Sequence, residues 1–271
     1  MNPTSLDKRR MDHLTWPEFA QRVKENYIFI LTVGAIEQHG PHLPIGFDYM
    51  SGNEISLKLA EQYPIVVMPP LMYGYRSQAT IGGGDQFPGT TCIGAEALMF
   101  TVRDILEELL RHNVKRIVVN NSHLENQSFL VEGIELVRRK YNLVDLQVKI
   151  LITGWGNFVK DDTLDACFEN GDFPGWDPEH AAVIETSAML ALRPEIVNLS
   201  LLPDETANRY PKYSIFPTPS DIVTKNGALA SAKGTTLAKG QRILKDVFDG
   251  FECAFDIEFG IKPNKFKVEG E

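Results

Sequence analysis

The chain has 271 residues, of which 43% are hydrophobic, and a formal net charge of −9 at pH 7. A chain of this length and composition can bury a sizeable core, and we expect one domain over residues 1–271. The acidic balance argues against nucleic acid as a partner, since that requires a basic face. No apolar run approaches the roughly eighteen residues of a membrane span. A small molecule is therefore the expected partner.

The N-terminal segment and the cysteines bear on cellular location. The first residues carry charges but lack the apolar stretch of a secretory signal. The three cysteines, Cys92, Cys167 and Cys253, are odd in number and widely spaced. This usage is typical of a reducing compartment, with each thiol acting as a small buried hydrophobe. The sequence therefore predicts a cytoplasmic protein.

Apolar runs and helical periodicity alternate along the chain. Ser51 is the expected N-cap of the second helix. Strands alternating with helices predict an α/β fold, with a mainly parallel sheet sandwiched between helices. In chain order we expect helix 14–26, strand 27–33, helix 51–63, strand 65–68, helix 93–112, strand 115–119, helix 126–141, strand 146–153, helix 179–192, helix 231–259 and a frayed tail over 264–271.

Metal-capable side chains follow the first predicted strand. Glu37 and His39 come soon after the strand, and Asp48 follows them. Charged groups at the carboxyl end of a strand lie where open α/β sheets bind ligands. Residues two apart on extended backbone project to the same side, so Glu37 and His39 suit one metal centre. Such a loop, taken alone, is more often a solvated turn than a metal site.

A second cluster of the same kind follows strand 115–119. His123 and Glu125 repeat the alternate spacing of the first cluster. The two clusters together give five nitrogen and oxygen ligands, which is too many for one tetrahedral zinc. Five such ligands suit two divalent ions that share a bridging carboxylate. Because no thiolate is among them, the set points to Zn²⁺ or Mn²⁺.

Two irregular stretches lie between the predicted elements. Residues 72–89 contain three successive glycines but neither of the phosphate-binding glycine motifs. We expect this loop to bring its backbone close to a small ligand or a neighbouring subunit. Residues 161–178 have the composition of a surface loop or lid that delivers Trp176, Glu179 and His180 to the mouth of the site.

Glu179, His180 and Glu185 form a third cluster. His180 and Glu185 are five positions apart, which is off the ideal facing positions of a helix, so the spacing leaves direct contact open. Glu179 is equally consistent with a favourable charge in the first turn of a helix. Glu185 stands among apolar residues, so we expect it to be buried and to need a partner.

Four blocks of this sequence resemble the creatininase (creatinine amidohydrolase) family. In order, the blocks are VGAIEQHGPHLPIGFD, GGGDQFPGTT, NNSHLENQSFLVEGIELV and GWDPEHAAVIETSAMLAL. The resemblance runs from about residue 14 to the C-terminal helix, and the separations of the blocks are similar. It implies a creatininase-like fold, two divalent metal ions per chain and a closed homohexamer.

Carried over position by position, the resemblance implies a role for each metal-capable residue. Glu37 and His123 are the expected ligands of the first ion. His39 and Glu125 are the expected ligands of the second ion, and Asp48 is the expected bridge between the two. These are the five residues that the two clusters had already indicated.

The resemblance also implies the chemistry. His180 is the expected proton shuttle, Glu185 orients it, and Glu125 is a further candidate base towards water. The implied reaction is metal-dependent hydrolysis of a C–N bond in a small cyclic amide, as when creatinine opens to creatine. The alternative of another class is a metal-stabilised assembly or binding protein without catalysis, which requires a closed coordination shell.

The expected pocket wall departs from the creatininase pattern. Leu124 stands where creatininase has a tyrosine, and Gly156 where it has a tryptophan, although Trp155 is adjacent. An aromatic cage suits a flat delocalised ring, so a family hydrolase acting on a formamide-pyrimidine or another small cyclic ketone or lactam is the alternative. The candidate substrate contacts are Trp176, Glu179, Ser77, Leu124 and Trp155.

Overall fold

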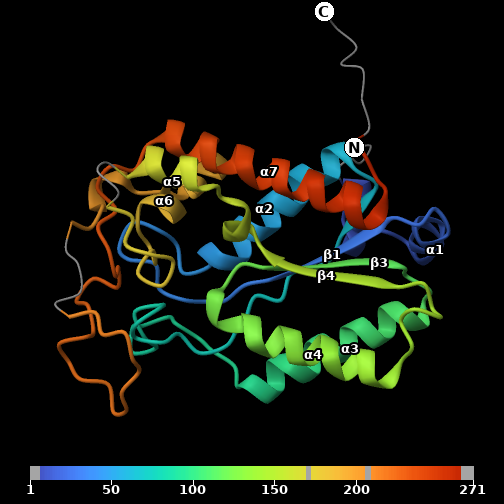
Figure 1. Cartoon of the computed structure of the whole chain (residues 1–271), viewed down its shortest axis with the longest axis horizontal. Helices are drawn as coiled ribbons and strands as arrows, with labels where there is room; N and C mark the ends of the chain where they lie inside the picture. The colour runs from blue at the N-terminus through green and yellow to red at the C-terminus, as the bar shows by residue number, and fades with distance from the viewer. Residues whose placement is uncertain (1–6, 169–171, 205–208, 264–271) are drawn as a thin grey trace, which may run out of the picture.

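Four parallel strands form the central sheet of the structure, a computed structural model that describes residues 7–168, 172–204 and 209–263. The strand order is β2-β1-β3-β4, and every neighbouring pair is parallel (Figure 1). The predicted α/β fold with a parallel sheet between helices is therefore confirmed. The strands are β1 Ile28–Val33, β2 Ile65–Val67, β3 Arg116–Asn121 and β4 Lys149–Gly154.

Helices cover both faces of the sheet (Figure 1). In β1, Phe29 and Leu31 point into one hydrophobic cluster, and Ile28 and Ile30 into the other. This alternation follows from the two-residue period of a strand, and both faces are apolar because both are covered. One face carries α3 (Ala95–Arg111) and α4 (Gln127–Lys140), with α1 (Trp16–Lys24) packed beside them, and the other carries α2 (Phe47–Gln62), α5 (Asp161–Cys167), α6 (Val183–Leu192) and α7 (Leu237–Phe259).

The start of α2 differs from the sequence prediction. The helix begins at Phe47, four residues before the expected cap Ser51, so Asp48 lies in its first turn and not in a loop. Phe47 is fully buried, and its packing fixes this earlier start. A carboxylate in the first turn is favoured by the helix dipole. Asp48 therefore lies on the rigid helix α2.

Three further boundaries were predicted wrongly. The helix expected from residue 179 begins at Val183, and the helix expected from residue 231 begins at Leu237, where the Thr236 side chain caps it by accepting from the Lys239 amide. Residues 161–167, expected within a loop, form α5. Burial of Leu164 and Cys167 against the core gives this short helix its stability.

A buried polar network joins α2 to the sheet. The Thr32 hydroxyl lies 3.1 Å from the Ser56 hydroxyl, and the Asn120 amide donates to the Gly52 carbonyl at 3.0 Å. Buried polar groups are costly unless they are hydrogen-bonded. These bonds therefore fix α2 relative to β1 and β3, and so fix the position of Asp48.

Other sequence expectations have mixed outcomes. All three cysteines are free; Cys167 is buried, whereas Cys92 is half-buried and Cys253 is exposed, so the expectation of burial was wrong for Cys253. Within the described ranges, none of the helices combines the length and the apolar character needed to cross a bilayer. The predicted tail over 264–271 lies outside the described residues, and the single domain stays a prediction.

Candidate metal centre and active site

The sheet register explains why two distant segments meet. In the pairing of β1 with β3, Val33 lies beside Asn121, so both strands end at the same edge. The chain turns in opposite directions from these two strands, which makes this the switch point where open α/β sheets bind ligands. The segments after Val33 and Asn121 therefore deliver their polar side chains into one space.

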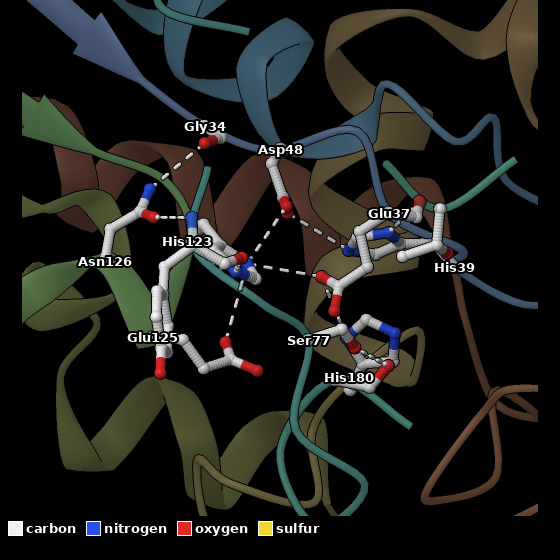
Figure 2. A network of polar contacts seen from close by, with 12 residues as sticks. Gly34, Glu37, His39, Asp48, Ser77, His123, Glu125, Asn126 and His180 are labelled. Carbon is white, nitrogen blue, oxygen red and sulfur yellow. Dashed lines mark hydrogen bonds and ion pairs between the residues drawn. The ribbon is translucent and has the colours of Figure 1, made fainter. Parts of the chain in front are cut away.

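Asp48 lies between two histidines at the centre of the cluster (Figure 2). One carboxylate oxygen of Asp48 is 3.1 Å from His39 Nε2, and the other is 3.2 Å from His123 Nδ1. All three side chains are almost completely buried. Asp48 therefore has the geometry of a carboxylate shared by two neighbouring sites.

Glutamates complete the groups on either side of Asp48. Glu37 Oε2 is 3.2 Å from His123 Nδ1, and Glu185 Oε2 is 3.8 Å from His39 Nε2. Three sets of three ligand atoms result, each within 4.8 Å of one another: Glu37 with Asp48 and His123, His39 with Asp48 and Glu185, and Glu37 with His39 and His180. Two atoms bound to one ion at about 2.1 Å are themselves about 3 to 3.5 Å apart, which agrees with the closest of these distances.

Hydrogen bonds orient the imidazoles so that one nitrogen of each is left for a metal. His39 Nδ1 lies 3.1 Å from the Glu37 carbonyl, and His123 Nε2 lies 3.1 Å from the Tyr75 carbonyl. Each carbonyl accepts a ring proton, as is usual for metal-binding histidines. Three buried atoms of the cluster then have no hydrogen-bond partner: Glu37 Oε1, His39 Nε2 and Asp48 Oδ2. Buried polar atoms without a hydrogen-bond partner in one cluster of carboxylates and imidazoles fit a metal centre.

Burial and the neighbouring charges shift the pKa values of the cluster. Burial alone would lower the pKa of His39, but Asp48 outweighs it and raises that pKa to about 10. The pKa of His123 lies well above its usual value because Glu125 and Glu37 overcome burial in the same way. The pKa values of Glu37 and Asp48 are lowered despite burial by the facing imidazoles. Glu37 and Asp48 therefore keep their negative charge, and a positive charge between them would be stabilised.

The glycine-rich stretch closes over this cluster. A side chain on Gly82 would meet Glu37 Oε1, because a Cβ there would lie only 1.9 Å from it. The predicted close backbone approach is thus made to a side chain of the cluster. Ser77 Oγ donates to the Gly82 carbonyl and accepts from the Gly84 amide, so this hydroxyl shapes the loop.

The third cluster lies at the start of α6. Ala181 has a positive φ of 57°, a conformation that non-glycine residues rarely adopt. Its amide donates to Glu185 Oε2 at 2.6 Å, which holds that carboxylate near His39. Glu179 is buried; one of its oxygens accepts from the Ile184 amide, and the other has no hydrogen-bond partner. Burial raises the pKa of Glu179 well above its usual value.

His180 packs against the cluster from the same turn. Its ring centroid is 4.3 Å from that of His39, and its Nδ1 is 4.0 Å from Glu37 Oε2. Burial, together with the charge of His39, lowers the pKa of His180 to about 4. The imidazole is therefore neutral at pH 7 in the surroundings that this structure describes.

A cavity of about 260 Å³ opens beside the cluster. Trp155 is buried in its wall, and Trp176 packs its ring against the backbone of Gly156. Ser77 does not line this cavity, and its contact with substrate stays a prediction. Among the predicted substrate contacts, those that do line it are Leu124, Trp155, Trp176 and Glu179.

Glu125 lies beside His123, and its expected role as a ligand of the second ion stays a prediction. Its Oε2 lies 3.5 Å from His123 Nδ1, on the Glu37 side, and its Oε1 accepts from the Gln78 amide. Glu185 stands instead beside His39. The folding of α6 onto the sheet edge brings Glu185 close to His39, which the sequence pattern alone does not show.

Comparison with known proteins agrees with this geometry. A family model described as creatininase, creatinine amidohydrolase, matches residues 12–254. The creatinine amidohydrolase of Pseudomonas putida is 40% identical over 248 residues, covering 91% of this chain and 95% of that protein. The chain belongs to the creatininase family. The resemblance inferred from four sequence blocks is confirmed, and the protein is a hydrolase of this family.

Solved creatininases share the fold. A crystal structure of creatinine amidohydrolase is 38% identical, has a TM-score of 0.88 and covers 94% of this chain and 99% of its own. Others at the same identity are described as creatininase with Mn and as a mutant creatininase complexed with creatine. This chain is also similar to the mycofactocin precursor peptide peptidase of Mycolicibacterium smegmatis, with 29% identity over 83% of this chain and 82% of that protein.

Replacing Asp48 by Asn should remove both metal ions together, because one carboxylate faces both groups. Glu185→Gln should empty only the His39 side. Glu54→Gln is a matched control, since Glu54 lies on the same helix but pairs with Arg193 outside the cluster, and it should keep two ions. Elemental analysis of the purified variants measures the stoichiometry. Two equivalents retained in Asp48→Asn would show that Asp48 does not bridge.

Proposed function

We propose that this protein is a binuclear metal-dependent amidohydrolase that opens a small cyclic amide, with creatinine to creatine as the best-supported reaction. The observation that carries the proposal is the pair of ligand groups sharing Asp48 at the wall of a small cavity. A cavity bordering the cluster leaves room for water and substrate, which favours an enzyme over a metal-stabilised assembly. The similarity to creatinine amidohydrolase supports the substrate.

The ligand roles follow from the distances. Glu37 and His123 would hold one ion and His39 and Glu185 the other, with Asp48 shared. The nitrogen and oxygen donors suit Zn²⁺ or Mn²⁺. When bound, two such ions supply Lewis acidity that activates water near neutral pH and polarises a carbonyl oxygen. This assignment revises the expected ligand role of Glu125 and gives Glu185 a ligand role in place of orienting His180.

Glu125 is then free to act as a base. It borders a second, smaller cavity of about 40 Å³ that Glu37, Asp48 and Glu185 also line. Burial raises the pKa of Glu125 to about 7. A carboxyl group with a pKa near the working pH is well suited to exchange a proton. We propose that Glu125 receives a proton from the attacking water and that the Gln78 amide, which donates to its Oε1, keeps it in place.

His180 is proposed to protonate the leaving nitrogen. It is neutral at pH 7, so it takes up the proton that Glu125 received from the attacking water and passes it to the leaving nitrogen, which returns both side chains to their starting states. It borders the same small cavity as Glu125 and Trp176. Amide hydrolysis requires this proton because an unprotonated amine is a poor leaving group.

The larger cavity limits the substrate to a small molecule. Trp155, Trp176 and the apolar side chain of Leu124 offer flat or apolar surface, and Glu179 lines the same cavity. Trp176 lies over Gly156, so its ring occupies the space that a larger residue 156 would take. Leu124 and Gly156 provide no aromatic ring to the cavity wall. Another small cyclic amide or a formamide-pyrimidine is therefore the alternative substrate.

Assembly and location are also proposals. The segment near residues 213–216 exposes large apolar side chains, with Phe216 83% and Tyr213 61% exposed, and such surface favours contact with other subunits. We propose a homohexamer in the cytoplasm.

Light scattering at micromolar concentration should give about six times the 30.4 kDa chain mass, and a monomeric mass would contradict the hexamer. Cell fractionation tests the location.

The activity is tested with purified protein loaded with Zn²⁺ or Mn²⁺. Creatinine should be converted to creatine, chelation should abolish the reaction, and re-addition of metal should restore it. His180→Ala should keep both ions while kcat falls by about 10²–10⁴-fold, the usual contribution of a positioned acid–base group.

Each contrary outcome has its own meaning. Loss of metal from His180→Ala would make His180 a ligand, and unchanged activity would make it structural. Hydrolysis of a formamide-pyrimidine or a lactam in place of creatinine would keep the mechanism and change the substrate. A fully loaded protein that hydrolyses none of these compounds would contradict the proposal.

A further inference from the structure

Gln38 stands between two metal ligands but is not one of them. Its side chain is buried, and its Oε1 accepts from the Gly40 amide at 3.0 Å. Its Nε2 lies 2.9 Å from the Gly82 carbonyl and 2.9 Å from the Gly227 carbonyl. A donor beside the oxygen and two acceptors beside the nitrogen fix the orientation of the amide, and both of its N–H groups are used.

The loops that meet this amide cannot carry side chains there. Gly83 and Gly227 have φ values of 76° and 88°. A Cβ on Gly227 would lie 1.6 Å from Gln38 Oε1, and one on Gly83 would lie 2.7 Å from Gln38 Nε2. Glycine is therefore required at both positions for conformation and for space. Two loops about 140 residues apart in sequence close on one side chain.

The same residue contacts His180 through its backbone. His180 Nε2 lies 2.8 Å from the Gln38 carbonyl and 2.9 Å from Gln38 Nε2. Because both N–H groups of the amide are already donated to Gly82 and Gly227, the amide has no proton left for His180. If His180 Nε2 carried no proton, its lone pair would face the lone pairs of the Gln38 carbonyl oxygen, and the two would repel each other. The proton of neutral His180 is therefore on Nε2, donated to the Gln38 carbonyl.

This tautomer leaves Nδ1 as the nitrogen that exchanges protons. Nδ1 lies on the Glu37 side of the ring, 4.0 Å from Glu37 Oε2, and His180 borders the small cavity between the ligand groups. The His39 ring stacks against His180 and limits its rotation. The hydrogen bond to the Gln38 carbonyl and the contact with the His39 ring together hold His180 in this pose.

We propose that Gln38 is a positioning residue for catalysis. Its carbonyl sets the tautomer of His180, and its amide locks the glycine loops around residues 82–84 and 224–230 against the ring. Loss of the amide removes one hydrogen bond from each loop at the point where it faces the ring, so the ring loses its single pose while the metal ligands on either side remain. The proposal rests on the proposed acid–base role of His180.

The tautomer is tested directly on the wild-type protein. Magic-angle-spinning NMR of the Zn²⁺-loaded protein, labelled with ¹⁵N-histidine, separates protonated from bare ring nitrogens. The chain has six histidines, and the spectrum of His180→Ala identifies the signals of His180. We expect a single species protonated at Nε2. A species protonated at Nδ1 would overturn the proposal without any variant at residue 38.

Gln38→Met tests the amide, since methionine is similar in size but neither donates nor accepts strongly. Metal content and KM should hold, kcat should fall by about 10- to 100-fold, and the His180 signals should split or broaden. Gln86→Met is the matched control, because Gln86 also donates to this loop, at the Gly83 carbonyl, without touching His180. It should keep the single tautomer and kcat within about 2-fold.

The outcomes separate this proposal from the proposed function. If Gln38→Met matches Gln86→Met in kcat and spectrum, Gln38 does not position His180, whereas the role of His180 itself stands. If His180→Ala remains fully active, the acid–base role fails first and the positioning proposal falls with it. If Gln38→Met does not fold, the wild-type spectrum still decides the tautomer.

Discussion

Repulsion among buried carboxylates is the constraint on which the rest of this structure depends. Glu37 and Asp48 are almost fully buried within a few ångströms of one another, and no lysine or arginine side chain pairs with them among the described residues. Buried charges without partners are costly. The two facing imidazoles offset this only if they hold protons, and divalent ions offset it more completely. We therefore read the cluster as a site built for metal.

The fold provides this site with rigid supports on several sides. The register of β1 with β3 joins two strand ends, the hydrogen bonds from Thr32 and Asn120 fix α2, and α6 brings Glu185 to the remaining side. Ligands held by separate elements keep their geometry when substrate enters, which is the condition for preorganised catalysis. The loops carry the pocket wall, so the wall can vary while the cluster stays constant.

The sequence predicted the fold class and the five clustered side chains because both depend on local pattern. Apolar strands with Glu37, His39 and His123 at their ends are visible without any tertiary contact. The closeness of Glu185 to His39, on which its proposed ligand role rests, was not predictable because it depends on how α6 packs. The role of Gln38 was equally hidden, although a polar side chain between two ligands is a signal that could have drawn attention to it.

Calorimetric titration of the metal-free protein with Zn²⁺ tests the central claim most directly, when it is repeated in buffers of different ionisation enthalpy. The pKa of His39 is raised to about 10, and the pKa of His123 is also well above its usual value. Both imidazoles therefore hold an extra proton at pH 7.5. A ligand must lose its proton, so metal affinity rises with pH over this range. The account predicts two equivalents bound with about two protons released. One equivalent, or binding without proton release, would contradict it.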